Sequence, residues 1–172
     1  MNKPNIMLMA NVAGTGKDTV ADYLESRYNY VKISFAEPIY SLAEEMFGMV
    51  EKDRKLLQDI GQKMREIDPD VWAKDAFKRA SLANFPVVIS DVRQKNEFQM
   101  GLEKGYLPLR VVTNRDIAIE RIVLRDGKCD LSRLDGPAED GTREIKVPQI
   151  FNNGTVEELY KQVELFMNSL VY

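Results

Sequence analysis

The feature that constrains this chain most is a short apolar segment that runs directly into a glycine-containing loop and then into a helix. Ile6-Met7-Leu8-Met9-Ala10 is apolar throughout, which predicts a strand buried on both faces of a parallel sheet. An amphipathic helix is expected over Lys17 to Tyr28. Between them, small residues let backbone N–H groups surround an anion, and a lysine at the helix start can reach its outer phosphates. The pattern predicts a nucleotide phosphate site formed by Asn11, Val12, Ala13, Gly14, Thr15, Gly16, Lys17, Asp18 and Thr19.

Two positions depart from the usual form of such a loop. Asn11 stands where a glycine is usual, and asparagine tolerates left-handed backbone geometry better than most residues. Asp18 stands where a serine or threonine usually follows the lysine. A carboxylate beside a polyphosphate is repelled unless a divalent cation lies between them, so we expect Asp18 to bind Mg²⁺ directly or through water. Two simpler interpretations stay open: a turn followed by a solvated lysine, and a helix N-terminal acid stabilised by the helix dipole.

Strands and helices are predicted to alternate along the whole chain. Further strands are expected at 31–35, 87–91, 107–112 and 147–151, and further helices after Pro38 and at 52–66, 71–83, 96–104, 117–125 and 156–170. This order predicts an α/β fold, a doubly wound parallel sheet of about five strands in one domain. Ligands of such folds bind at the carboxyl ends of the strands, where Asp91 and Asn153-Gly154 would join the glycine loop. Asp91 is therefore a second candidate to bind Mg²⁺ or to orient a substrate.

Composition excludes several classes of function. The 172 residues include no histidine, which removes Ser-His-Asp and Cys-His catalysis and histidine-ligated metals. Cys129 is the single cysteine and cannot form an intrachain disulfide. With 24 basic and 27 acidic residues the formal charge is −3, which argues against a broad nucleic-acid or membrane surface but is compatible with a small basic pocket. The N-terminus lacks the apolar core of a signal peptide, and no apolar run approaches a membrane helix, so we expect a cytoplasmic protein.

Four stretches of the sequence form a combination that is fairly specific. They are Gly-Lys-Asp-Thr-Val-Ala at 16–21, Ser-Phe-Ala-Glu-Pro-Ile at 34–39, Asp-Val-Arg-Gln-Lys-Asn-Glu at 91–97 and Asn-Asn-Gly-Thr-Val-Glu-Glu-Leu at 152–159. Together they resemble the phage and bacterial deoxynucleoside monophosphate kinases, within the nucleoside monophosphate kinase branch of P-loop proteins. Dephospho-coenzyme A kinases share the last stretch and the pattern Arg121…Arg125-Asp126-Gly127, and animal-type phosphomevalonate kinases share Gly-Lys-Asp.

The resemblance implies an ATP- and Mg²⁺-dependent kinase that transfers the γ-phosphoryl group to a (deoxy)nucleoside monophosphate. Asn11 to Thr19 would surround the ATP phosphates, and Lys17 would neutralise charge on the transferred group. Arg93 would hold the acceptor's phosphate, for which a salt bridge to a helix is the alternative. Phe35 and an acceptor-binding helical region at about 36–84, with Arg54, Arg65 and Trp72, would form the acceptor pocket. Exposed, solvated arginines are the alternative for Arg54 and Arg65.

The stretch 126–148 is polar and rich in glycine and proline, which predicts a lid that closes over the site. Arg121 and Arg125 stand four residues apart on the helix leading into it, so both could reach ATP, and we assign the catalytic role to Arg125. By the resemblance, Glu139 would face the acceptor. Asn153-Gly154 would pass near adenine, with an ordinary turn as the alternative.

Two departures from the family concern the acceptor and the lid. Tyr40 stands where a lysine commonly follows the Phe-Ala…Pro motif, and Gly136-Pro137-Ala138-Glu139 lacks the usual His and Ser. The alternative functions are a kinase for another phosphorylated small molecule, such as dephospho-coenzyme A, and a non-catalytic nucleotide-binding regulatory protein. The GTPase signature Asn-Lys-x-Asp is missing, which disfavours a switch.

Overall fold

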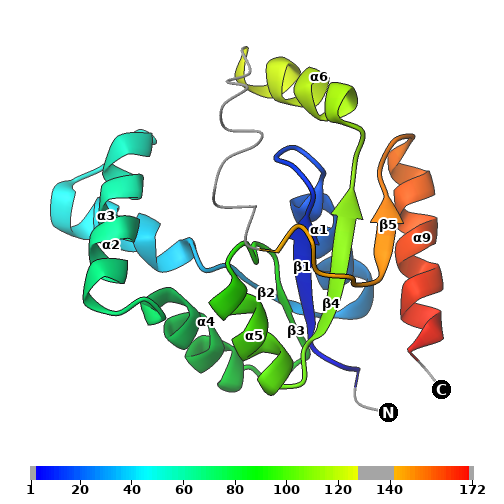
Figure 1. Ribbon diagram of the computed structural model, residues 1–172, viewed down its shortest axis with the longest axis horizontal. Coiled ribbons are helices and arrows are strands. Elements are labelled where there is room, and N and C mark those ends of the chain that lie inside the picture. Colours follow the sequence, from blue (N-terminus) through cyan, green and yellow to red (C-terminus); the bar gives the residue numbers. More distant parts are fainter. Residues whose placement is uncertain (1–2, 128–141, 171–172) are drawn as a thin grey trace.

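The centre of the molecule is one parallel sheet, described in a computed structural model that covers residues 3–127 and 142–170. Its strands lie in the order β2-β3-β1-β4-β5 (Figure 1). They are β1 (Ile6–Ala10), β2 (Val31–Ile33), β3 (Val87–Ile89), β4 (Leu107–Val112) and β5 (Gln149–Phe151). All five side chains of β1 are buried because this strand pairs with β3 on one side and β4 on the other. The predicted α/β fold with a doubly wound parallel sheet is confirmed.

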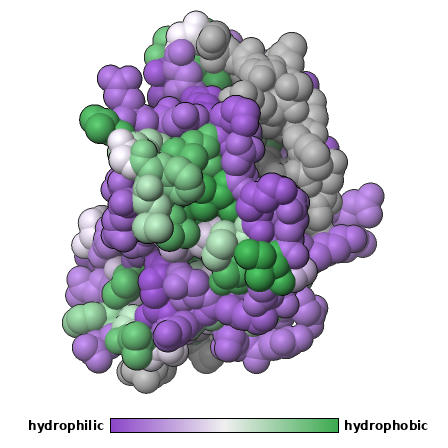
Figure 2. Space-filling view, turned by 90° about the vertical axis from the view of Figure 1, so that its left-hand side faces the viewer, coloured by the Kyte–Doolittle hydropathy of each residue, from purple (hydrophilic) through white to green (hydrophobic). Residues whose placement is uncertain are grey.

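Seven helices are formed by the described residues, and they cover both faces of the sheet (Figure 1). They are α1 (Lys17–Tyr28), α2 (Glu37–Phe47), α3 (Arg54–Ile67), α4 (Val71–Ser81), α5 (Lys95–Glu103), α6 (Arg115–Asp126) and α9 (Val156–Ser169). Helices α2 and α3 project to one side of the sheet. Figure 2 views the molecule from that side and shows hydrophobic areas among hydrophilic ones; the exposed apolar side chains of α2 and the turn after it are Met46, Phe47 and Val50. No helix within the described ranges has the length and apolar character needed to cross a membrane.

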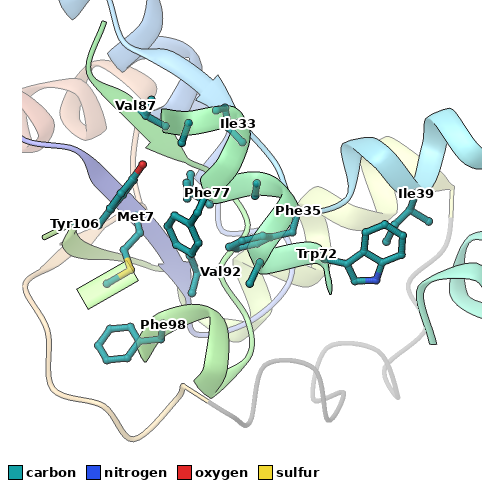
Figure 3. Packing of buried hydrophobic residues seen from close by; sticks show 14 of the residues in the cluster. Met7, Ile33, Phe35, Ile39, Trp72, Phe77, Val87, Val92, Phe98 and Tyr106 are labelled. Atoms are coloured by element: carbon teal, nitrogen blue, oxygen red, sulfur yellow. The ribbon is translucent and has the colours of Figure 1, made fainter. Parts of the chain in front are cut away.

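Alternation along β1 divides the core into two clusters. Ile6 and Leu8 belong to the cluster that contains side chains of α1 and α9, such as Val20 and Leu159. Met7 and Met9 belong to the other cluster, which also holds side chains of α2, α3, α4 and α5 (Figure 3). The sheet is thus packed on both faces, as the apolar run of β1 predicts.

Local sequence signals set several helix ends. Thr155 caps α9, as predicted, and forms a capping box with Glu158. Asp53 caps α3 by accepting a hydrogen bond from the Leu56 N–H at 3.0 Å. Two strands end earlier than predicted, at Ile33 and Ile89. After β2, the N–H groups of Phe35 and Ala36 bond to the Asp91 side chain instead of a neighbouring strand.

The predicted lid overlaps packed structure at both ends. Residue 126 belongs to α6, and Thr142 is buried and accepts a hydrogen bond from the buried Arg110 of β4. Ile145 and Val147 pack against the core. Residues 142–148 are therefore anchored to the sheet, and the lid itself stays a prediction. The part of the prediction at 128–141, which includes Glu139, lies outside the described residues.

Candidate active site

The loop between β1 and α1 has the backbone geometry of an anion cradle. Gly14 and Gly16 have φ angles of 80° and 86°, which favour glycine. Gly16 is also the N-cap of α1 and provides no side chain to bond the first N–H groups of the helix, so they remain available to a ligand. A Cβ on Gly14 would lie 3.0 Å from Ile122 Cγ1 and 3.1 Å from the Ala118 oxygen, so the loop packs directly on α6. These features fit a polyphosphate.

Asn11 has a different role from the one its position suggests. Its φ is not positive; instead its amide bonds to the backbone of Thr113, at the end of β4. Asn11 Nδ2 donates to the Thr113 oxygen at 2.9 Å, and the Thr113 N–H donates to Asn11 Oδ1 at 3.1 Å. The tolerance of asparagine for left-handed geometry is therefore not used here; the side chain instead links the loop to the residue that follows β4 through two hydrogen bonds.

Asn152, the residue after β5, holds the glycine loop through its side chain. Its Nδ2 donates to the Thr15 oxygen at 2.8 Å and would lie 2.6 Å from a Cβ on Gly16. Its backbone oxygen accepts from Thr113 Oγ1 at 3.2 Å and from Arg121 Nη1 at 2.9 Å. Asn152 is only 7% exposed. One buried residue therefore connects β5, the end of β4, α6 and the glycine loop through its side-chain amide and its backbone oxygen.

A small cavity of about 210 Å³ adjoins this amide. It is lined by Gly16, Thr19, Arg121, Asn152, Gly154, Val156 and Leu159. Asn153 does not line it; its Oδ1 accepts from the Asn114 N–H at 2.7 Å. A Cβ on Gly154 would collide with the Glu158 carboxylate and displace it from the Thr155 N–H, to which it bonds at 3.0 Å. The structure brings Arg121 and Gly154 together beside the glycine loop.

A larger cleft of about 750 Å³ lies between the strand ends and the projecting helices. Its basic lining residues are Lys52, Arg54, Arg65, Arg93 and Arg125, against two acidic ones, Asp91 and Glu97. Phe35 and Tyr40 add aromatic surface. An excess of three positive charges in a protein of net charge −3 favours an anionic ligand in the cleft.

Trp72, predicted to contact the acceptor, does not line the cleft. It is 3% exposed and packs in the same cluster as Ile39 (Figure 3). Its Nε1 donates to the Gly61 oxygen at 3.1 Å. Because Gly61 does line the cleft, the indole stabilises a residue of the cleft wall without lining the cleft itself.

Asp91 holds the loop that follows β2. Its Oδ2 accepts from Ser34 Oγ at 2.7 Å and from the Ala36 N–H at 3.2 Å, and its Oδ1 accepts from the Phe35 N–H at 2.9 Å. Both oxygens are thus used by one loop, which places Phe35 at the cleft. The carboxylate thus holds the loop that carries Phe35, and the assignment of Asp91 to Mg²⁺ or to substrate orientation stays a prediction.

Asp18 has the more accessible carboxylate of the two magnesium candidates. Its side chain is 80% exposed, and its Oδ1 lies 3.4 Å from Lys32 Nζ. In the described part of the chain, no group of three or more acidic, cysteine or histidine side chains is arranged to hold a metal ion. Mg²⁺ is usually bound by one or two carboxylates together with substrate phosphates. A single exposed carboxylate in the first turn of α1, beside Lys17, fits that mode.

Glu97 is a buried carboxylate at the floor of the cleft. Its Oε2 accepts from the N–H groups of Arg93 at 2.9 Å and Gln94 at 3.0 Å, and its Oε1 lies 3.9 Å from Arg65 Nη2. Burial raises the pKa of Glu97 above its usual value, although the two backbone hydrogen bonds act in the opposite direction. The carboxylate ties the loop that carries Arg93 to helix α3.

Three residues of the site were missed by sequence reasoning. Lys52 Nζ lies 5.4 Å from the centroid of the Tyr40 ring, so a cation is present above the tyrosine that replaces the usual lysine. Asn152 directly precedes the predicted Asn153-Gly154 pair, and its location at a strand end was the available signal. Asp126 bonds to two of the predicted arginines. No local pattern indicates such contacts between distant segments.

The fold and the glycine loop define the class: the chain has the fold of P-loop kinases. No family model matches the chain. Among solved structures it is similar to TT1252 from Thermus thermophilus (TM-score 0.67, 19% identity, 100% of both chains). It is also similar to a gluconokinase from Sinorhizobium meliloti, with a TM-score of 0.61 and 15% identity over 98% of this chain and 93% of that chain. A shikimate kinase from Acinetobacter baumannii is similar with a TM-score of 0.61 and 17% identity, over 98% of this chain and 96% of that chain.

The relatives found by sequence are viral. One, from Acanthamoeba polyphaga mimivirus, carries the description "Putative deoxynucleotide monophosphate kinase" and is 28% identical over 189 aligned positions, which cover 87% of this chain and 89% of the relative. The other, protein ORF76 of Ictalurid herpesvirus 1, is 30% identical over 99 positions, covering 54% of this chain and 41% of that protein. The resemblance to deoxynucleoside monophosphate kinases is confirmed at the level of a similar sequence and a P-loop kinase fold.

Proposed function

We propose that the protein is a kinase that transfers the γ-phosphoryl group of ATP, with Mg²⁺, to a (deoxy)nucleoside monophosphate. The observation that carries the proposal is the basic cleft beside the glycine loop, with five basic side chains against two acidic ones. A neutral acceptor would leave this charge uncompensated, whereas a phosphate dianion matches it. The mimivirus relative, whose description names a deoxynucleotide monophosphate kinase, supports the same substrate class.

Each part of the site has a role in this reaction. Residues 11–19 bind the ATP phosphates through backbone N–H groups, with Lys17 beside the transferred group. Asp18 is the residue that we assign to Mg²⁺, whose charge offsets that of the phosphates. Arg121 and Gly154 line the cavity that we assign to the adenine. Phosphoryl transfer relies on positioning and charge neutralisation, so a chain without histidine can perform it.

The acceptor side is formed by the larger cleft. Arg93 is exposed there, and in the described part of the chain its guanidinium has no carboxylate partner, so it is available to the acceptor's phosphate. Phe35 and Tyr40 offer aromatic surface to a base. Arg125 lies where α6 approaches the cleft and is the arginine that we assign to the transferred phosphoryl group, a role worth about 10³–10⁵-fold in related chemistry.

The test is an acceptor screen with Mg²⁺ and ATP. The acceptors are the ribo- and deoxyribonucleoside monophosphates, together with gluconate, shikimate and dephospho-coenzyme A, and products are identified by chromatography. We expect turnover of at least one nucleoside monophosphate, and Lys17→Met should nearly abolish it while leaving the circular dichroism spectrum unchanged. Turnover of only the other acceptors would refute the substrate class. Nucleotide binding without turnover of any acceptor would favour a regulatory protein.

A further inference from the structure

Two arginines of the cleft converge on one carboxylate. Asp126, the last residue of α6, accepts hydrogen bonds from Arg125 Nε at 2.8 Å and Nη2 at 2.9 Å. The same carboxylate accepts from Arg54 Nη2 at 3.3 Å, and Arg54 is the first residue of α3. The contact joins segments 72 residues apart in the sequence. One side chain therefore fixes the relative position of two guanidinium groups that come from different helices.

The carboxylate and the arginines face different surroundings. Arg54 and Arg125 both line the 750 Å³ cleft, whereas Asp126 does not. Arg125 uses one edge of its guanidinium on Asp126 and Arg54 uses a single nitrogen. Each guanidinium has five N–H donors, so both retain donors for a ligand in the cleft. Two positive charges and one negative charge leave the group with an excess of one positive charge.

Helix α6 also connects this group to the glycine loop. A Cβ on Gly14 would contact the Ala118 oxygen and the Ile122 side chain of α6, so the helix and the loop are in direct contact. Hydrogen bonding to Asp126, and further the charge of Asp18, raise the pKa of Arg125 above its usual value. Arg125 therefore lies within the electrostatic range of the first turn of α1, where the ATP phosphates are proposed to bind.

We propose that Asp126 is a positioning residue that holds Arg54 and Arg125 as one phosphate clamp between the ATP side and the acceptor side of the cleft. The proposal rests on the proposed function and adds a residue that acts through its two arginine partners. An exposed arginine samples many rotamers, and holding two of them in advance lowers the entropic cost of binding a phosphate. The competing account is that Asp126 occupies the arginines only at rest and is displaced by the phosphate.

The two accounts predict opposite effects of Asp126→Asn. If Asp126 positions the arginines, the variant should lose roughly 10- to 100-fold in kcat/KM for the accepted nucleoside monophosphate. Asp126→Glu should recover part of the loss, because it restores the charge. Glu120→Gln is the matched control: it removes one acidic charge from an exposed position of the same helix and should leave kcat/KM unchanged. If Asp126→Asn instead lowers KM for the acceptor, the clamp proposal is wrong and the displacement account holds.

A second measurement does not depend on catalysis. Inorganic pyrophosphate is titrated calorimetrically into wild-type protein, Asp126→Asn and Glu120→Gln, and the Arg125 Nε–H signal is followed by ¹⁵N NMR. We expect weaker pyrophosphate binding and faster Nε–H exchange in Asp126→Asn only. If the wild-type protein phosphorylates no nucleoside monophosphate, the proposed function fails, and this titration still decides the clamp. Unchanged or tighter pyrophosphate binding in Asp126→Asn would overturn the clamp even in an active kinase.

Discussion

Replacing Asn152 with alanine removes the side chain that connects β5 to the glycine loop. The Thr15 oxygen would lose its 2.8 Å hydrogen bond and keep only a 3.3 Å contact with Thr113 Oγ1, whose single proton it shares with the Asn152 oxygen, in a residue that is 2% exposed. Leaving a buried acceptor poorly satisfied costs roughly 1–3 kcal/mol, so we expect about 2 kcal/mol of lost stability. For a chain of this size that corresponds to a decrease in Tm of about 4–8 °C.

The same substitution should weaken nucleotide binding, because the loop backbone loses its support under Gly16. Stability is measured by denaturant unfolding, and affinity by titration with a non-hydrolysable ATP analogue. Asn153→Ala is the matched control: it removes a neighbouring amide of the same kind, whose 2.7 Å bond to the Asn114 N–H is at the surface, where water can replace it. If Asn152→Ala and Asn153→Ala lose equal stability and bind the analogue like the wild type, the buried amide does not support the loop.

Two further predictions concern the carboxylates of the site. Asp18→Ala should shift the Mg²⁺ dependence of turnover to higher concentrations but change stability by less than about 1 kcal/mol, because the Asp18 carboxylate in the pair with Lys32 is exposed. Asp18→Ser should restore part of the activity. If both variants have the Mg²⁺ titration curve of the wild type, Asp18 is only a helix-terminal acid. The raised pKa of Glu97 means that the folded state binds its proton more tightly than the unfolded state. The contribution of this group to stability therefore falls as pH rises from its unfolded pKa through its folded pKa. Glu97→Gln should remove this pH dependence of stability in denaturant unfolding, and an unchanged pH dependence would contradict the assignment.

The fold could be predicted because its signals are local. The apolar run 6–10 and the run 107–112 correspond to β1 and β4 without adjustment. Thr155 and Pro38 mark helix starts through their own chemistry. The glycine loop was recognisable because an anion cradle is formed by consecutive residues. Alternation of such segments leaves few topologies open.

The site could be predicted only in part, because the partners of its polar residues are distant in sequence. Asp91 is predicted to bind Mg²⁺ or to orient a substrate, whereas its hydrogen bonds to the N–H groups of a loop 55 and 56 residues away have no signal in the sequence. Trp72 was assigned to the ligand by its place in a helical region, and packing against the core placed it behind the wall. Neither outcome depends on a pattern within ten residues, so neither can be derived from periodicity or motif spacing.

The residues just after the strands and those on the helices have different roles in this site. Asn11, Asp91, Thr113 and Asn152 follow β1, β3, β4 and β5, and each uses its side chain to hold the backbone of another loop. The arginines that line the two cavities come mainly from α3 and α6. Parallel strands bring their carboxyl ends to one edge, where neutral and acidic side chains can satisfy loop backbone groups at short range. Long cationic side chains then reach over this fixed edge from the surrounding helices, so the positive charge of the two cavities comes mainly from groups that the sheet does not need for its own stability.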